Sequence, residues 1–254
     1  AHVLFSDMLW KVHDSTGHTF VKLVAKLKPE LVNFRAPREI DPINGASKYI
    51  HPDEMQKVLR EEPEDTIIVD ARSRYEYEVG RFKNALTLDI ENFRELPEQL
   101  EALKEHADKR VITYCTGGIK CAKLTAYLLD EGFKNVEQLH GGILGYAEHS
   151  GGEDFEGQCY VFDDRVTVPV NQVNPKVIGQ CQNCGAPTER AVNCANAKCH
   201  KRTLLCDDCA EELQGSCSPE CYESPHRRPW DGTGLYHKAG RLSAAQKERL
   251  KTEA

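Results

Sequence analysis

Between residues 51 and 150 the chain alternates short apolar runs with stretches whose apolar residues recur at helical spacing. The apolar runs have the length of buried strands in a parallel sheet, which show little alternation because both faces are covered. These runs lie at 66–72 and 111–115, with a third strand at 136–140 and a weaker candidate at 85–90. The helical stretches lie at 51–62, 92–106, 119–133 and 143–150. The alternation predicts an α/β domain with a parallel sheet flanked by helices, which we place at residues 52–150.

The pattern changes on the N-terminal side of this domain. Residues 19–27 alternate apolar and polar side chains and predict a strand with one buried face, which residues 31–34 continue. We interpret residues 1–35 as the C-terminal part of a small α+β domain. Residues 36–51 contain two prolines and show no hydrophobic period, so we expect a linker there. Because the sequence begins with Ala1 and not with methionine, we expect a fragment whose true N-terminus is missing.

The C-terminal part of the chain has a different composition. Residues 151–175 predict an extended connector. Residues 176–221 have few apolar side chains but contain eight of the eleven cysteines. Residues 222–254 are polar and end in a short basic helix, so we expect a loosely attached tail.

Length, composition and charge narrow the class of protein. With 254 residues the chain can form two or three domains, and it has no apolar run near the roughly 20 residues that cross a bilayer. We therefore expect no membrane partner. The net charge is -7, and residues 51–175 hold 25 acidic against 14 basic groups, whereas both ends are mildly basic. We expect no DNA partner, and we expect any contacts with RNA phosphates to come from the ends.

The uneven distribution of the cysteines indicates the cellular compartment. Three lie in the middle of the chain, one of them at a predicted strand end, and eight form close pairs downstream. This arrangement is typical of a cytosolic enzyme with a metal module and not of a secreted disulfide scaffold. We therefore expect a cytoplasmic protein.

One cysteine has the surroundings of a nucleophile. Cys115 ends an apolar strand and is followed by Gly117, Gly118 and a predicted helix. Ligands of a parallel sheet bind at the carboxyl ends of its strands, and the glycines allow the backbone amides of residues 116–120 to converge on the sulfur. These amides and the helix N-terminus stabilise a thiolate. The alternative is a buried structural cysteine before a tight turn.

The spacing of this loop distinguishes two enzyme classes. Cysteine-type phosphatases require an arginine at the position that Cys121 occupies here. A cysteine cannot hold a phosphate through two hydrogen bonds as an arginine does. The loop from Cys115 to Lys120 instead fits the narrower rhodanese type, which cradles a persulfide. Cys121 lies about one turn beyond the loop. It either resolves an oxidised Cys115 as a disulfide or is an inert helix residue that faces the core.

The eight downstream cysteines have the spacing of metal ligands. Close cysteine pairs hold one tetrahedral zinc ion between two of them, so eight thiolates predict two structural zinc ions that replace a hydrophobic core. The pairs are Cys181 with Cys184, Cys194 with Cys199, Cys206 with Cys209, and Cys217 with Cys221. The spacing leaves three questions open: sequential or interleaved pairing, His200 in place of Cys199, and one zinc or disulfides in place of two zinc ions.

Several segments together resemble the rhodanese superfamily and one family within it. VDARSRYEYEVGRFKNA (69–85) resembles the rhodanese stretch in which an aspartate and an arginine brace the domain, and QLHGGI (138–143) resembles its closing Gly-Gly segment. With CTGGIKCAK, DPINGASKYIHPDE and CYVFDDRVTV, these segments are similar to the rhodanese-domain tRNA uridine-34 hydroxylases, over about residues 20 to 221.

This resemblance implies a ferredoxin-like N-terminal domain, a central rhodanese domain and a C-terminal cysteine-rich module. It implies oxygen-dependent conversion of the wobble uridine of tRNA to 5-hydroxyuridine, with molecular oxygen as co-substrate and the anticodon loop of tRNA as partner. The family's essential cysteine falls on Cys115 and its second loop cysteine on Cys121. The chain departs from the family at Lys120, where arginine is usual, and at His140, where an acidic residue is frequent. Lysine keeps the charge but loses the planar fork.

A site that receives an unstacked base needs aromatic and basic groups around it. The residues expected in the loop and at its rim are Thr116, Gly117, Gly118, Ile119, Lys120, Arg72, Arg81 and Arg165. For Arg72 the structural alternative, a salt bridge with Asp70, is preferred.

Three functions compete for this sequence. In the first, tRNA hydroxylation, the thiolate of Cys115 adds to C6 of uracil and raises the electron density at C5. The second is transfer of sulfur from thiosulfate or a persulfide donor to a thiol. The third is a non-catalytic rhodanese-like scaffold that binds RNA or protein. The oligomeric state is not predicted.

Overall fold

The computed structural model describes residues 6, 19–20, 25–43, 45, 47–163 and 165–235. The chain divides into two compact units. One comprises Leu27–Phe162 and Val166–Tyr236, and the other includes Asp163–Arg165 with both ends of the chain. The first unit contains the cysteine loop and all eight paired cysteines.

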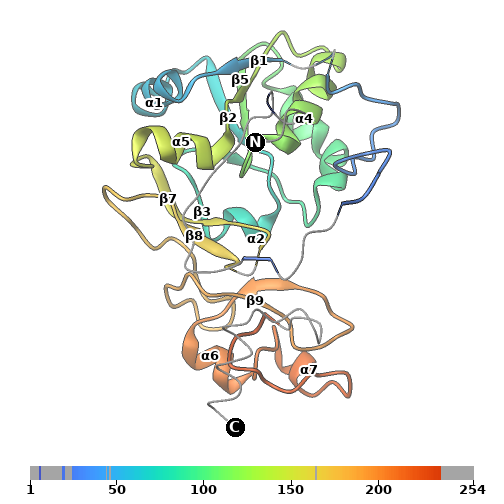
Figure 1. Cartoon of the computed structure of the whole chain (residues 1–254), viewed down its shortest axis with the longest axis vertical. Coiled ribbons are helices and arrows are strands. Elements are labelled where there is room, and N and C mark those ends of the chain that lie inside the picture. The colour runs from blue at the N-terminus through green and yellow to red at the C-terminus, as the bar shows by residue number, and fades with distance from the viewer. Residues whose placement is uncertain are drawn as a thin grey trace. The chain divides into compact units, whose positions relative to one another are not determined.

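A five-stranded sheet organises the first unit (Figure 1). Its strands lie in the order β1 (Lys48–Ile50), β6 (Asn135–Leu139), β5 (Arg110–Tyr114), β2 (Thr66–Asp70) and β4 (Leu86–Thr87), and all neighbours are parallel. Consecutive residues Ile68 and Val69 belong to different apolar clusters, because successive side chains point to opposite faces. Both faces are therefore covered, as the uninterrupted apolar runs predicted.

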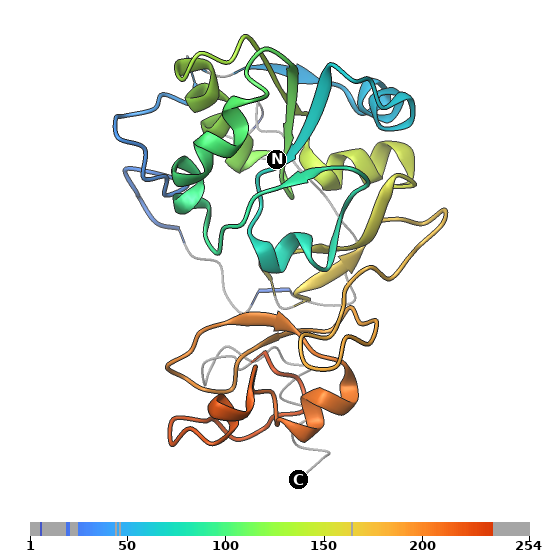
Figure 2. The same ribbon diagram turned by 180° about the vertical axis from the view of Figure 1, so that it is seen from behind.

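Helices cover the two faces of this sheet (Figures 1 and 2). On one face, α1 (Pro52–Glu61) and α5 (Gly142–Ser150) bury their apolar residues in one cluster. On the other face, η2 (Phe93–Gln99), α3 (Leu100–Lys104) and α4 (Ile119–Asp130) contribute to the second cluster. The prediction of an α/β domain with a parallel sheet flanked by helices is confirmed.

One predicted helix is divided. The stretch 92–106 begins as the 3-10 helix η2 and becomes the α-helix α3 only at Leu100. Pro97 lies inside η2 and has no backbone N–H to donate, so a regular α-helical ladder cannot pass through it.

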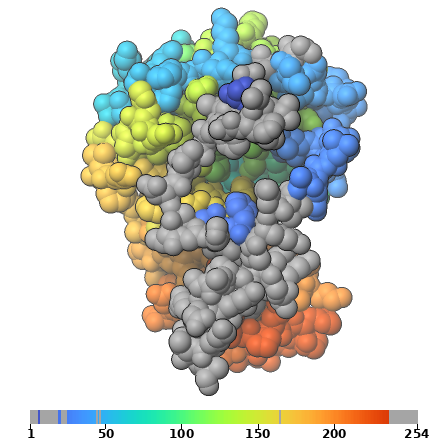
Figure 3. Space-filling model, in the orientation of Figure 1, coloured from blue at the N-terminus to red at the C-terminus, as the bar shows by residue number. Residues whose placement is uncertain are grey.

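The segment before the domain differs from its prediction. Residues 31–34 form no strand and pack against helices of the domain instead, with Phe34 only 6% exposed. The ring centroid of Phe34 lies 5.0 Å from that of Phe93 and 5.2 Å from that of Tyr127. Figure 3 shows this segment, in blue, on the molecular surface. Phe34 thus packs on η2 and α4, and residues 31–34 do not pair in a sheet. Residues 21–24 of the strand expected at 19–27, and most of the α+β domain expected at 1–35, lie outside the described residues.

The predicted linker at 36–51 also needs correction. Its last residues form β1, which pairs with β6 from Lys48 opposite Glu137 to Ile50 opposite Leu139. A strand of three residues is too short to show a hydrophobic period, so the sequence carried no signal for it.

The rest of the unit is antiparallel. β3 (Gly80–Phe82), β7 (Phe155–Tyr160) and β8 (Thr167–Pro169) form a three-stranded sheet, so the expected connector at 151–175 holds two strands. In the cysteine-rich region β9 (Ala191–Asn193) pairs with β10 (Arg202–Leu204), followed by α6 (Asp207–Glu212) and α7 (Pro219–Tyr222). Within the part of the chain that the structure describes, no helix has the length and apolar character to cross a membrane.

Candidate active site and cysteine clusters

Cys115 lies where β5 ends and directly before the turn into α4. Gly118 is the N-cap of α4 with φ 87°, a left-handed conformation that glycine adopts without strain, and its amide N–H donates to Cys115 Sγ at 3.1 Å. The backbone amides of Lys120 and Cys121 also favour the charged form of this sulfur. The predicted convergence of loop amides on Cys115 is therefore present.

A second Gly-Gly segment supports the loop from the neighbouring strand. After β6, the amides of Ile143 and Leu144 donate to the carbonyls of Cys115 and Thr116 at 3.0 and 3.1 Å. A Cβ on Gly142 would lie 2.5 Å from the Cys115 carbonyl oxygen, so the contact requires a residue without a side chain. The N-terminal turn of α5 thus holds the cysteine loop in place.

The two loop cysteines differ in protonation. The pKa of Cys115 is lowered to about 6 by a hydrogen bond from the Cys121 thiol, by the charge of Lys120 and by the amides, against the opposing effect of burial. Burial and the neighbouring thiolate raise the pKa of Cys121 well above its usual range. Cys121 therefore stays protonated, and its S–H group donates a hydrogen bond to Cys115. The residue Cys115 is 2% exposed and Cys121 is fully buried. At neutral pH the arrangement is one thiolate beside one thiol.

Alkylation of Cys115 by iodoacetamide is expected to follow this pKa. The thiolate is the reactive form, and the pKa of Cys115 is lowered. The alkylation rate should therefore be maximal above pH 7 and should decrease as the pH is lowered, with its midpoint at about pH 6. Cys121→Ala removes the largest stabilising contact and should move the midpoint toward the ordinary value of about 8.5, whereas Cys121→Ser retains a donor and should shift it less. Peptide mass spectrometry of timed alkylation resolves Cys115 from the other cysteines. A wild-type midpoint near 8.5 would contradict the thiolate assignment.

Lys120 is held by a buried carboxylate. Its Nζ lies 2.7 Å from Oε2 of Glu76, whose side chain is fully buried and whose Oε2 also accepts from the Ser73 amide at 3.1 Å. Glu76 belongs to the short helix α2 (Arg74–Tyr77). The ammonium also lies 5.4 Å from the ring centroid of Phe162. Because Glu76 compensates its charge, Lys120 is not a free cation for an anionic ligand.

Each of the three arginines expected at the rim has a partner other than the loop. Arg72 is fully buried and donates from Nε and Nη2 to both carboxylate oxygens of Asp70, at 2.9 and 2.6 Å, so its placement at the rim is wrong and the structural alternative holds. Arg81 is partly buried and donates to the Tyr77 carbonyl at 3.1 Å. Arg165 pairs with Asp163 at 2.5 Å within the other unit. Of the four basic candidates, Lys120 is the one that belongs to the loop itself.

Two residues at the loop have no signal in the sequence that places them there. Glu76 carries a local signal, the Ser73-x-x-Glu76 capping box, but this predicts a helix start and not a partner for Lys120. Phe162 stands in the segment CYVFDDRVTV, yet nothing in that segment indicates an exposed ring beside Lys120.

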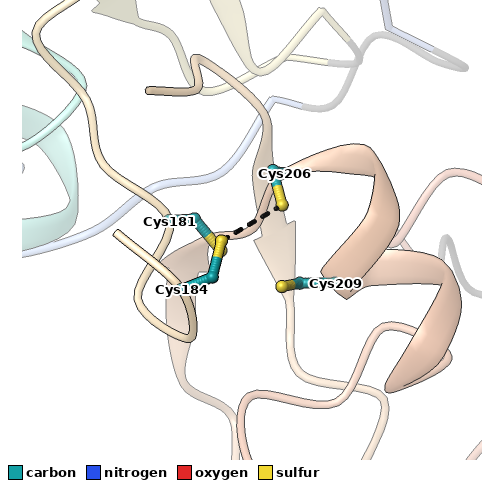
Figure 4. A group of neighbouring side chains, drawn as sticks. All are labelled: Cys181, Cys184, Cys206 and Cys209. Atoms are coloured by element: carbon teal, nitrogen blue, oxygen red, sulfur yellow. Dashed lines mark hydrogen bonds between the residues drawn. The ribbon is translucent and has the colours of Figure 1, made fainter. Parts of the chain in front are cut away.

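The eight downstream cysteines form two groups. Cys181, Cys184, Cys206 and Cys209 make the first group (Figure 4), and Cys194, Cys199, Cys217 and Cys221 make the second. The pairs therefore combine in the interleaved order, and Cys199, not the exposed His200, belongs to the second group. None of the eleven cysteines forms a disulfide in this structure, contrary to the disulfide alternative.

The geometry of both groups fits a tetrahedral ion. Zn–S bonds of about 2.3 Å place two sulfurs about 3.8 Å apart. The Sγ atoms of Cys184 and Cys206 are 3.6 Å apart, those of Cys199 and Cys217 are 3.7 Å apart, and those of Cys217 and Cys221 are 3.8 Å apart. Donors also surround the sulfurs: the amide groups of Asn183 and Asn196 donate to Cys209 and Cys221 at 3.2 and 3.4 Å. Such bonds orient thiolate ligands and stabilise their charge.

Known protein families match both the α/β domain and the cysteine-rich region. Residues 51–149 match the family described as Rhodanese-like domain, and residues 156–222 match the family described as Rhodanase C-terminal. A tRNA uridine(34) hydroxylase of Cytophaga hutchinsonii is 47% identical over 234 residues, which cover 92% of this chain and 74% of that protein. A tRNA uridine(34) hydroxylase of Bacillus thuringiensis is 42% identical over 227 residues, covering 88% of this chain and 70% of that protein. A rhodanese-like domain protein from Staphylococcus aureus, with a solved structure, has a TM-score of 0.34 at 26% identity and covers 39% of this chain and 90% of that chain.

Proposed function

The chain belongs to the tRNA uridine(34) hydroxylase family, and we infer from this membership that it hydroxylates the wobble uridine of tRNA. We propose that molecular oxygen is the co-substrate, that 5-hydroxyuridine is the product and that Cys115 is the catalytic nucleophile. The substrate is the anticodon loop of tRNA, and the reaction takes place in the cytoplasm. The observation that carries the proposal is the Cys115 sulfur at the carboxyl edge of the sheet, which accepts from the Gly118 amide at 3.1 Å.

The chemistry that this sulfur can perform on uracil is conjugate addition. The thiolate forms a bond to C6, and the electron pair of the C5=C6 bond moves onto C5 and the O4 carbonyl. C5 thereby becomes the electron-rich position and attacks molecular oxygen, which gives a C5 hydroperoxide. Loss of H5 and of the outer oxygen as water leaves a C5 carbonyl. The Cys121 sulfur then attacks the Cys115 sulfur, and the electron pair of the broken C6–S bond returns to the ring as the enol of 5-hydroxyuridine. The two thiols, oxidised to a disulfide, thus supply the two electrons that reduce the second oxygen atom to water. The pKa of about 6 matters because the nucleophile is already deprotonated at neutral pH and needs no separate base.

Cys121 serves this step as a hydrogen-bond donor. Its thiol is the strongest of the contacts that lower the pKa of Cys115, and its own pKa is raised by burial. The same proximity makes Cys121 the partner for a disulfide if Cys115 is oxidised. Both roles require that the two sulfurs stay adjacent in the folded protein.

The two cysteine groups would each hold one structural zinc ion. Four thiolates close the coordination sphere, so the ions would supply folding free energy and not an open position for a substrate. The apolar cluster of this region is small, and two of its five buried members, Cys181 and Cys209, are themselves ligands. The proposed zinc ions therefore take the place of a hydrophobic core.

The alternative functions have less support. A thiosulfate sulfurtransferase needs a loop that attracts a dianion, and here the loop cation Lys120 is compensated by Glu76 at 2.7 Å. A non-catalytic scaffold does not require a cysteine whose pKa is lowered to about 6.

The proposal is tested with purified protein and unmodified tRNA under air, oxygen-18 gas or nitrogen, followed by mass spectrometry of the nucleosides. We expect 5-hydroxyuridine under air, the same nucleoside with one heavy oxygen under oxygen-18, and no product under nitrogen. A cyanide-trapping assay with thiosulfate runs in parallel. Sulfur transfer without any hydroxylated nucleoside would overturn the proposal in favour of a sulfurtransferase.

A further inference from the structure

An exposed aromatic ring lies beside the cysteine loop. Phe162 follows the end of β7 and is 56% exposed, whereas its neighbours Tyr160 and Val161 are 7% and 6% exposed. Large apolar side chains are normally buried, and a single exposed one needs no explanation. Phe162 differs from such a residue because its backbone and its ring both lie against the cysteine loop.

The backbone that carries Phe162 is fastened to the loop. Thr116, the residue after the nucleophile, donates from Oγ1 to the Tyr160 carbonyl at 3.3 Å. The Val161 amide donates to the Val166 carbonyl at 2.8 Å. The peptide unit between Tyr160 and Val161, just before Phe162, is therefore held by two hydrogen bonds, and one of them ends at the loop of Cys115.

The ring itself is oriented by two contacts. The Lys120 ammonium lies 5.4 Å from its centroid, and the Tyr160 ring lies 5.5 Å away at 66°, an edge-type arrangement. Glu76 fixes Lys120 from the buried side, at 2.7 Å. Although it is exposed, the ring is thus preorganised, which lowers the entropic cost of binding a flat ligand against it.

The chemistry around the ring selects the ligand. Lys120 has its charge compensated by Glu76, so the surface beside the nucleophile offers a π-face without a free cation for a phosphate. Ile119, also in the loop, is 61% exposed and adds a second apolar group. An unstacked nucleobase is flat and apolar on its faces, and it gains from stacking on such a ring whatever its sequence context.

We propose that Phe162 is the stacking platform for the nucleobase that is delivered to Cys115. The inference rests on the proposed function and adds a binding site to it: the ring of Phe162, with Lys120 and Ile119 beside it, receives an unpaired pyrimidine of single-stranded RNA. In this role Phe162 is a positioning residue, since it holds the base while the sulfur reacts.

The first test separates binding from chemistry. Phe162→Leu keeps an apolar side chain but removes the π-face, and we expect the KM for tRNA to rise by about 5- to 150-fold, the range for loss of one base–aromatic stack, with kcat changed much less. Phe162→Trp restores an aromatic face and should return KM toward the wild-type value. As the matched control, Leu129→Ala changes another exposed apolar residue, about 15 Å along α4 from the loop, and should leave KM unchanged. Equal KM values for wild type and Phe162→Leu would overturn the inference.

A second test does not depend on turnover. An anticodon stem-loop with 5-iodouridine at the wobble position is irradiated on the full-length protein, and cross-linked peptides are mapped by mass spectrometry. We expect the cross-link at Phe162, lost in Phe162→Leu, while alkylation of Cys115 in that variant keeps its wild-type pH profile and so shows an intact loop. Cross-linking at Phe162 without hydroxylation by the wild type would refute the proposed function alone. Hydroxylation with cross-links elsewhere would refute the platform alone.

Discussion

Cys115→Ser is expected to abolish the formation of 5-hydroxyuridine while the protein still folds and binds tRNA. A serine hydroxyl fits the cradle, and the Gly118 amide that donates to the sulfur at 3.1 Å can donate to oxygen as well. The hydroxyl nevertheless stays protonated at neutral pH, whereas the pKa of the thiol is lowered to about 6. Loss of a covalent nucleophile costs on the order of 10³-fold or more in rate.

The measurement is nucleoside mass spectrometry of tRNA from cells that lack the gene and are complemented with either version. Cys159→Ala serves as the control, because Cys159 is another fully buried cysteine but burial raises its pKa to about 12. Cys159→Ala should retain the modification and Cys115→Ser should lack it. Hydroxylated uridine in cells that contain only Cys115→Ser would show that the sulfur is not the nucleophile.

Removal of metal is expected to unfold residues 176–222 and to leave the parallel sheet intact. The purified protein should contain two zinc ions per chain by elemental analysis, since two groups of four thiols have tetrahedral spacing. A chelator combined with a thiol-blocking reagent removes ions of this kind and with them the folding free energy of the module. Trp230 packs against the small apolar cluster there and donates to Glu211 at 2.7 Å, so its fluorescence should shift toward that of an exposed indole.

Variants of the ligands test how the pairs combine. In the interleaved arrangement Cys181 and Cys206 share one group, so the double variant Cys181→Ser/Cys206→Ser should keep one zinc ion per chain. Sequential pairing would place them in different groups, and the same variant would lose both ions. His200→Ala is the matched control and should keep two. A native protein that is folded and free of metal would contradict the zinc assignment.

Much of the central domain is predictable because its signals are local. The runs at 66–72, 111–115 and 136–140 correspond to β2, β5 and β6. Because β2 and β5 are buried on both faces, their segments contain consecutive apolar residues. The loop is predictable for the same reason. A strand end, two glycines and a helix start are neighbours along the chain, so their order alone locates Cys115 and the amides around it.

Contacts between distant residues are beyond the reach of such signals. Lys120 pairs with Glu76, which lies 44 residues away in the sequence. No sequence pattern around either residue indicates this pairing. The short strand β1 lies in a stretch that reads as linker, because three residues cannot display a period. The apolar residues of 31–34 are compatible with a strand, although Phe34 packs on helices of the domain.

By itself, then, the sequence determined the α/β domain, the position of Cys115 at a strand end before a glycine turn, and the spacing of the eight paired cysteines, since each depends on spacing over a few residues. Only the tertiary structure decided that Lys120 pairs with Glu76, that the cysteine pairs interleave, and that Phe162 stands exposed beside Lys120. The physical reason is that these contacts join residues far apart in the sequence. They depend on how whole helices and strands pack, which local sequence propensity does not determine.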